Sequence, residues 1–257
     1  MKVVPFKRMV LTPIIHTISD TEIAAIAAMG FSFEGTVGPP ARFISTNFPN
    51  FDLLTLLQEV DRQLGCTTKE KIQKIIFLKD DGGLADLQIQ YNSADYNDEN
   101  LGLALMRKLA WEDSGLMATH QYSRLPSLFR KQGISKVILR AFVQQYVNMG
   151  VKKILLFAGL EDGGLVWAKL HFLATDKSDV DRILATAKVT LLPKQIRFVE
   201  KIYLNYYSQH PEGQSFPLYK WAELDFMESI LRKSTWYGAV DLTNQQEFTN
   251  FIEHAIK

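Results

Sequence analysis

Apolar residues recur at helical spacing in several separate segments of the chain. SDTE at residues 19–22 is a capping box followed by IAAIAAM, and Gly30 is the expected end of that short helix. A longer helix is predicted over 51–64, with Gly65 as its stop signal. Its apolar face consists of Phe51, Leu54, Leu57, Val60 and Leu64. The segment between the two helices is rich in Gly, Pro and Asn and is expected to be a loop.

The middle of the chain changes from helical spacing to alternation. QKIIFLKDDGGLADLQIQY, residues 73–91, predicts two strands joined by a turn at 80–83, because glycines tolerate the positive φ of a hairpin. In the second strand Leu84, Asp86, Gln88 and Gln90 share a face, which is too polar for a core. Residues 98–110 are expected to be helical, and SGLMATHQYSRL at 114–125 to be a strand.

A strand, helix, strand and helix follow one another over residues 114–172. The apolar face of 134–149 predicts a long helix that ends at Gly150, KKILLFAGL a buried strand, and GGLVWAKLHF a helix that leads into Phe172. This order indicates an α/β fold. From Asp176 onward the pattern favours long helices, and STWYGAVDL at 234–242 could complete the sheet. We therefore expect a first unit over 1–175 and a mainly helical region over 176–257 that could belong to the same domain.

The C-terminal region admits three interpretations. It could finish the core, cover one side of a binding site, or mediate dimerisation. We place completion of the core first, because its apolar positions would otherwise remain exposed.

Composition narrows the class of protein. Hydrophobic residues at 47% and charged residues at 22% are typical of a folded globular chain. A net charge of +1 gives no overall field that would attract nucleic acid or an anionic membrane, and no apolar run approaches the length of a membrane span. Cys66 is the only cysteine, so an internal disulfide and a cysteine-rich metal site are both excluded. The start of the chain lacks a convincing cleavage site, and we expect a cytoplasmic protein.

The junction FRKQGIS at 129–135 carries the clearest chemistry. A helix start has unpaired amides and a partial positive charge, and glycine there lets a phosphate approach the backbone. Arg130 would add a charged partner. An ordinary strand-to-helix connection also uses a glycine and a solvated basic residue, so the motif gains its weight from the surrounding strands and helices. Generic binding of a nucleotide or phosphate is one interpretation of it.

The order of elements around this junction resembles the GNAT superfamily of acyl-CoA N-acyltransferases. In that family Q/R-x-x-G-x-G/A begins the central helix and binds the pyrophosphate of coenzyme A. Arg130, Gly133 and Ser135 occupy the motif positions, and VWAKLHF is similar to the family's later helix, with Phe172 at its final aromatic position. The specific resemblance covers residues 115–173. It implies a mixed, mostly antiparallel sheet flanked by helices.

The resemblance also implies a function and a set of site residues. The chain would transfer an acyl group, expected to be acetyl, from acyl-CoA to an amine of a small molecule or protein by direct attack, without a metal. The coenzyme would lie against Leu125, Arg130, Lys131, Gln132, Gly133, Ile134 and Ser135. His120 is our first candidate for the base, because its ordinary pKa suits neutral catalysis. Glu112 and Asp113 at the start of the same strand are the alternatives.

Four positions depart from the family pattern, and one of them is Leu160, which appears where an asparagine is common. Ser135 replaces a Gly or Ala, and His171 replaces a glycine. Trp167 stands where many members have the tyrosine that protonates the leaving thiolate, and an indole N–H is no useful acid near neutral pH. These departures keep a second hypothesis open, a non-catalytic GNAT-like scaffold that binds a partner protein. The five histidines show no metal-ligand spacing, so no metal site is predicted.

Overall fold

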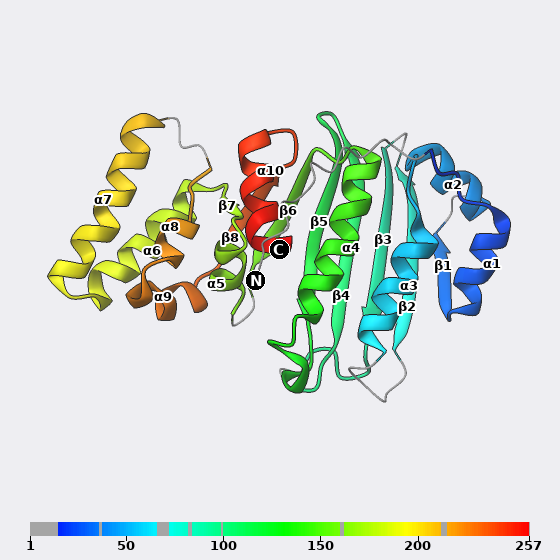
Figure 1. Cartoon of the computed structure of the whole chain (residues 1–257), viewed down its shortest axis with the longest axis horizontal. Coiled ribbons are helices and arrows are strands. Elements are labelled where there is room, and N and C mark those ends of the chain that lie inside the picture. The colour runs from blue at the N-terminus through cyan, green and yellow to red at the C-terminus, as the bar shows by residue number, and fades with distance from the viewer. Residues whose placement is uncertain are drawn as a thin grey trace, which may run out of the picture.

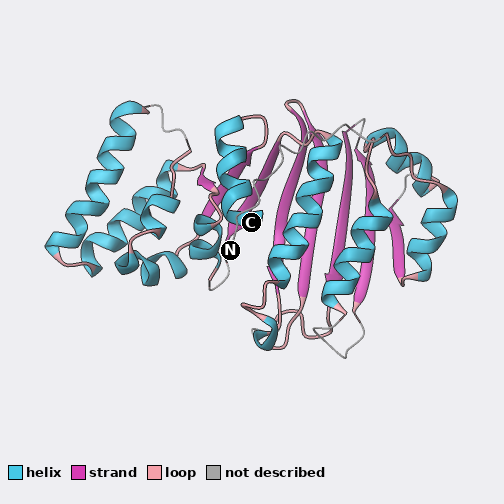
Figure 2. Cartoon of the chain, in the orientation of Figure 1, coloured by secondary structure: helices cyan, strands magenta, loops and turns pink. Residues whose placement is uncertain are grey.

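A computed structural model describes residues 15–35, 38–65, 72–81, 84–98, 100–159, 162–211 and 215–256. Cys66, Leu160 and the glycines of the 80–83 turn lie outside these residues, as does the start of the chain. Ten α-helices and eight strands are assigned within the described part (Figures 1 and 2). The strands are β1 Phe31–Gly35, β2 Gln73–Asp81, β3 Leu84–Asn92, β4 Ala104–Glu112, β5 Gly115–Arg124, β6 Lys153–Ala158, β7 Leu173–Ala174 and β8 Trp236–Asp241.

The strands form a single mixed sheet in the order β1-β2-β3-β4-β5-β6-β8-β7. The pairs β1–β2 and β5–β6 are parallel, and the other neighbours are antiparallel. The predicted α/β class with a mostly antiparallel sheet is therefore confirmed. The GNAT identity of the fold stays a prediction.

The N-terminal part contains α1 Asp20–Ala28, α2 Pro40–Asn47 and α3 Leu53–Leu64. The capping box of α1 forms as predicted, with Glu22 accepting from the amide of Ser19 at 2.8 Å. The expected loop between α1 and α3 was wrong, because it contains both β1 and α2. A proline opens α2, where its missing N–H costs nothing, and Phe43 and Ile44 bury its inner face.

The helix predicted over 98–110 is also wrong, because most of this segment is strand β4. Ala104, Met106 and Lys108 are good helix formers, and this local preference misled the sequence interpretation. The side chains instead alternate between the two faces of a strand. Leu105 and Leu109 are buried on one face, while Lys108 lies on the other and pairs with Asp86. Ladders with β3 and β5 on both sides hold the segment extended.

Alternation in β3 agrees with the sequence prediction. Leu87, Ile89 and Tyr91 are buried, and the polar residues of the same strand occupy the opposite phase. The helices α3 and α4 (Ile134–Met149) lie side by side over the sheet. Two further elements complete this part, the short 3-10 turn η1 Ser127–Phe129 and helix α5 Gly163–Lys169.

The C-terminal region joins the same core. Its helices are α6 Lys177–Thr190, α7 Pro193–Gln209, α8 Tyr219–Ala222, α9 Glu228–Arg232 and α10 Gln245–Phe251, with the short helical turns η2 Asp225–Met227 and η3 Ile252–Ile256. Strand β8 enters the sheet between β6 and β7, so the prediction that STWYGAVDL completes the sheet is confirmed. One hydrophobic cluster contains buried residues of both regions. Within the described residues, none of the helices combines the length and apolarity that crossing a bilayer would require.

Candidate functional site

The parallel strands β5 and β6 pair over only part of their length. Met117 to His120 pair with Lys153 to Leu156, after which β5 continues to Arg124 and β6 to Ala158 without a shared register. The ladder between β4 and β5 shifts at the same level, so Gln121 becomes the extra residue of a bulge. Beyond His120, no strand of the described chain pairs with β5 on the side that faced β6.

The loop that follows β5 folds back on itself. The Nε atom of Arg130 donates to the carbonyl of Leu125 at 2.9 Å, and the side chain of Gln132 donates to the carbonyl of Leu128 at 2.7 Å. Lys131 and Gly133 both have positive φ, at 63° and 82°. Two left-handed residues within three positions turn the chain sharply from the loop into α4, and glycine adopts this conformation without a Cβ penalty.

The first turn of α4 is an open helix start. Gly133 is the N-cap residue and supplies no side chain to cap the helix. The amides of Lys136 and Val137 bond the carbonyl of Gly133, whereas the structure records no acceptor in the described chain for the amides of Ile134 and Ser135. Apart from the two chain neighbours of Gly133, no residue has an atom within 4 Å of the position that a Cβ on Gly133 would take. Ile134 is buried and Ser135 is exposed, so this open helix start lies at the boundary between the core and the surface.

A buried cation lies behind this helix start. Arg107 of β4 is 3% exposed, and the described residues offer it no carboxylate partner. Its Nη1 atom donates to the carbonyls of Met106 and Tyr122, at 2.9 and 2.6 Å, and its Nε atom is buried without a partner in the described chain. Burial lowers the pKa of Arg107 to about 10, so the guanidinium remains charged near pH 7.

A small cavity connects this cation with the loop. Arg107, Ser123, Arg124, Leu125 and Ser135 line it, together with apolar residues of α3, α4 and β4, and it has room for about one water molecule. Positive charge, two hydroxyl groups and the start of α4 therefore converge at the carboxyl end of β5. Such a constellation attracts an anion.

His120 lies in the interior. It is 3% exposed, its Nε2 atom is 3.1 Å from the hydroxyl of Tyr146, and its ring also contacts Trp167 and Phe172. Desolvation, followed by the charge of Arg107, holds the pKa of His120 well below its usual range. A neutral, enclosed imidazole is a weak base, so the structure gives His120 a packing position beside the site.

The alternative bases lie far from the loop. Glu112 ends β4 and Asp113 follows in the turn before β5, whereas Leu125 comes directly after the other end of β5. A ten-residue strand is roughly 33 Å long at its usual rise, so neither carboxylate is near the start of α4. The structure brings together Leu125, Arg130, Gly133 and Ser135 and leaves Glu112 and Asp113 at the opposite end.

The segment 163–172, whose end resembles the family pattern, contains one residue with a positive φ. His171, which stands where the resemblance implies glycine, has a φ of 64°. This left-handed conformation is one that glycine adopts without a Cβ penalty. The neighbouring Phe172 is fully buried. Trp167 packs edge-on against Phe172 with ring centroids 5.1 Å apart and takes part in the core.

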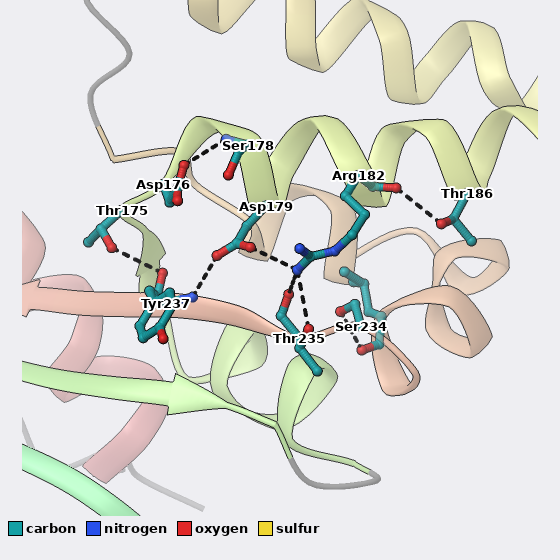
Figure 3. A network of polar contacts seen from close by, with 10 residues as sticks. Thr175, Asp176, Ser178, Asp179, Arg182, Thr186, Ser234, Thr235 and Tyr237 are labelled. Atoms are coloured by element: carbon teal, nitrogen blue, oxygen red, sulfur yellow. Dashed lines mark hydrogen bonds and ion pairs between the residues drawn. The ribbon is translucent and has the colours of Figure 1, made fainter.

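A second polar cluster joins α6 to β8 (Figure 3). The buried carboxylate of Asp179 accepts from the amide of Tyr237 at 2.9 Å and from Arg182 at 2.7 Å, and Arg182 also donates to the carbonyl of Thr235. A cleft of about 290 Å³ lies beside it, with Lys233 and several hydroxyl groups in its lining. Because the carboxylate of Asp179 already balances the charge of Arg182, we interpret this network as a structural contact that holds α6 against β8.

We expect the substitution Asp179→Ala to destabilise the protein by about 2–3 kcal/mol, because it leaves the amide of Tyr237 without its acceptor and removes the carboxylate that balances Arg182. Urea denaturation followed by circular dichroism measures the loss. Asp181→Ala is the control on the same helix, since its exposed contacts with Lys177 and with the hydroxyl of Tyr203 should together contribute less than about 1 kcal/mol. Equal losses in the two variants would contradict the assigned role of Asp179.

No family model matches this chain, and no curated protein matches it.

Sequence reasoning did not identify Arg107. The signal was available, because Leu103, Leu105, Arg107 and Leu109 follow the alternation of one strand face, and an arginine in that apolar series is unusual. Assigning the segment to a helix hid the alternation. Once β4 is recognised as a strand, Arg107 is the residue that requires an explanation.

Proposed function

We propose that the chain is an acyl-CoA-dependent N-acyltransferase, with acetyl as the expected acyl group and an amine of a small molecule or protein as the acceptor. The observation that carries the proposal is the open start of α4, where unpaired amides adjoin the loop from Leu125 to Gly133. The family resemblance assigns this loop to the pyrophosphate of coenzyme A.

The charges at the junction support a diphosphate ligand. The described chain offers no acceptor for the amides of Ile134 and Ser135, the helix dipole favours an anion at this end, and Gly133 leaves room for close approach. Arg107 supplies a second source of positive potential from within the protein, beside Ser135. A bound phosphate would thus offset a buried charge that has no carboxylate partner in the described chain.

The separation of β5 from β6 supports an extended ligand. Main-chain groups of β5 beyond His120 lack a neighbouring strand on that side, and an extended molecule with amide groups can hydrogen-bond to such an edge. The arm of coenzyme A carries amides of this kind, and its thioester supplies the activated acyl group. In the proposal the amides of this edge near Leu125 orient the acyl carbonyl and stabilise negative charge on its oxygen.

The test is release of the coenzyme A thiol from acetyl-CoA in the presence of a panel of primary amines. We expect amine-dependent release by the wild-type chain and a loss of about 10- to 100-fold in kcat/KM for Arg130→Ala, because a charge-assisted contact to phosphate is removed. Arg197→Ala, an exposed arginine of α7, is the control and should retain full activity. No release with any amine would count against catalysis.

A non-catalytic scaffold is the second candidate. Two observations favour it: His120 is enclosed by Tyr146 and Trp167, and the exposed rings of Phe157 and Tyr237 contact each other in a tilted arrangement on neighbouring strands, with centroids 4.8 Å apart. Exposed aromatic pairs are common in protein interfaces. Coenzyme binding without amine-dependent thiol release would favour this scaffold over the enzyme.

A further inference from the structure

Three side chains of the metal-ligating type meet at the N-terminal side of the molecule. His16, Glu22 and Asp52 each offer one ligand atom, and these atoms all lie within 4.8 Å of one another. The three residues come from the segment before α1, the first turn of α1 and the start of α3. One imidazole and two carboxylates form a donor set that suits a divalent transition-metal ion.

The nitrogen atom of His16 is the least satisfied member of the group. Its Nε2 atom is buried and lies 3.4 Å from Oε1 of Glu22, yet it makes no hydrogen bond within the described chain. In a neutral imidazole with an unprotonated Nε2, the lone pair would face carboxylate oxygens, and these acceptors repel one another. A cation between them removes the repulsion. A proton on Nε2 is the competing occupant.

Each carboxylate is fixed by one of its own oxygens. Oε2 of Glu22 accepts from the amide and hydroxyl of Ser19, both at 2.8 Å, which leaves Oε1 on the side of His16. Oδ1 of Asp52 accepts from the amide of Thr55 at 3.0 Å as the N-cap of α3. Such second contacts orient metal ligands in advance and reduce the entropy lost on binding.

The backbone around the group is also held. The amide of His16 donates to the side chain of Asn50, and the amide of Asn50 donates back to the carbonyl of His16, at 3.3 and 3.2 Å. The amide of Asp52 donates to the side chain of Gln145, a buried residue of α4, at 3.1 Å. Contacts from four segments therefore hold the three ligands in place.

We infer that His16, Glu22 and Asp52 bind a divalent transition-metal ion such as Zn²⁺ or Mn²⁺, with water completing its coordination. The partial positive charges at the N-terminal ends of α1 and α3 repel the ion. The two full negative charges of Glu22 and Asp52 outweigh this repulsion. The role of the ion is structural. Gln145 follows Ser135 by ten residues along α4, or roughly 15 Å, so the site is separate from the proposed coenzyme loop.

The test is a calorimetric titration of the full chain, freed of metal with a chelator, with Zn²⁺ alone and with Mg²⁺ alone. We expect saturable binding of one Zn²⁺, an accompanying rise in melting temperature, and no comparable response to Mg²⁺, which prefers oxygen ligands. Absence of Zn²⁺ binding, or equal binding of Mg²⁺, would overturn the inference.

Glu22→Gln and Asp52→Asn are the informative variants. Glutamine is accepted in a capping box and asparagine is a good N-cap, so both variants keep their helices capped while losing a charged ligand. We expect Zn²⁺ affinity to fall at least about tenfold in each, since even the loss of an outer contact to a metal ligand costs about 10- to 100-fold. Unchanged affinity in both variants would contradict the site.

A pair of histidines elsewhere requires its own control. His171 and His254 stack with ring centroids 3.7 Å apart and could bind Zn²⁺ independently. His254→Gln removes this pair and should leave the titration unchanged. Loss of binding in His254→Gln with retention in His16→Gln would assign the ion to the histidine pair and overturn the inference.

Discussion

Ser135→Glu is expected to weaken binding of coenzyme A about 10- to 100-fold while leaving the protein as stable as the wild type or more so. The new carboxylate would lie at the second position of α4, where it interacts favourably with the helix dipole by about 0.3–1 kcal/mol. The same charge would repel a phosphate held by the neighbouring amides. Few substitutions are expected to move stability and binding in opposite directions.

The control is Ser135→Gln, which has nearly the size of glutamate and no charge. We expect it to retain most of the affinity, because Ser135 is exposed and the ligand is held by main-chain amides. Calorimetry measures the affinities and thermal melting measures the stabilities. Equal affinities for Ser135→Glu and Ser135→Gln would show that no phosphate binds at the start of α4.

Trp236→Ala is expected to reduce the free energy of unfolding by about 3–5 kcal/mol and the melting temperature by about 10 °C. Trp236 is fully buried in β8, and its indole N–H donates to the carbonyl of Gly164 in α5 at 3.2 Å. Removal of the ring would leave a cavity between sheet and helix and an unsatisfied carbonyl. Urea denaturation followed by circular dichroism is the measurement.

Tyr237→Ala is the matched control one residue further along the strand. Its side chain is 56% exposed, and its main-chain amide still reaches Asp179, so we expect a loss below about 1 kcal/mol. Similar losses in the two variants would mean that β8 is not an integral part of the core. A large loss in Trp236→Ala alone would show that the packing of β8 against α5 contributes to the stability of the core.

Periodicity predicted the elements that are buried on one face. Helices α1, α3 and α4 follow from apolar residues at helical spacing and from their capping residues, and β3 follows from alternation. In these segments the local preference of the residues and the demands of the core agree. Such agreement is what makes an element readable from sequence.

The errors occurred where tertiary contacts override local preference. Residues such as Met106 and Lys108 favour a helix, and only the ladders with β3 and β5 make β4 extended. Strand β1 has five residues and pairs with β2. The first residue of β2, Gln73, lies 38 positions after the last residue of β1, Gly35. A local sequence pattern contains no information about a pairing between strands so far apart in the chain.

Only part of the candidate site was predictable. The loop from Leu125 to Ser135 is contiguous, so its motif can be recognised in the sequence. Arg107 comes to the site through β4, and the ligands His16, Glu22 and Asp52 meet through contacts between separate segments. Histidine spacing within one helix could not reveal that group, because it contains a single histidine.

The central claim is that the start of α4 binds coenzyme A. The most direct measurement is a calorimetric titration of the purified wild-type chain with acetyl-CoA and, separately, with coenzyme A. We predict saturable binding of both ligands with a stoichiometry near one, because the diphosphate is common to them. A well-folded chain that binds neither ligand would contradict the claim and leave the open helix start without the proposed role.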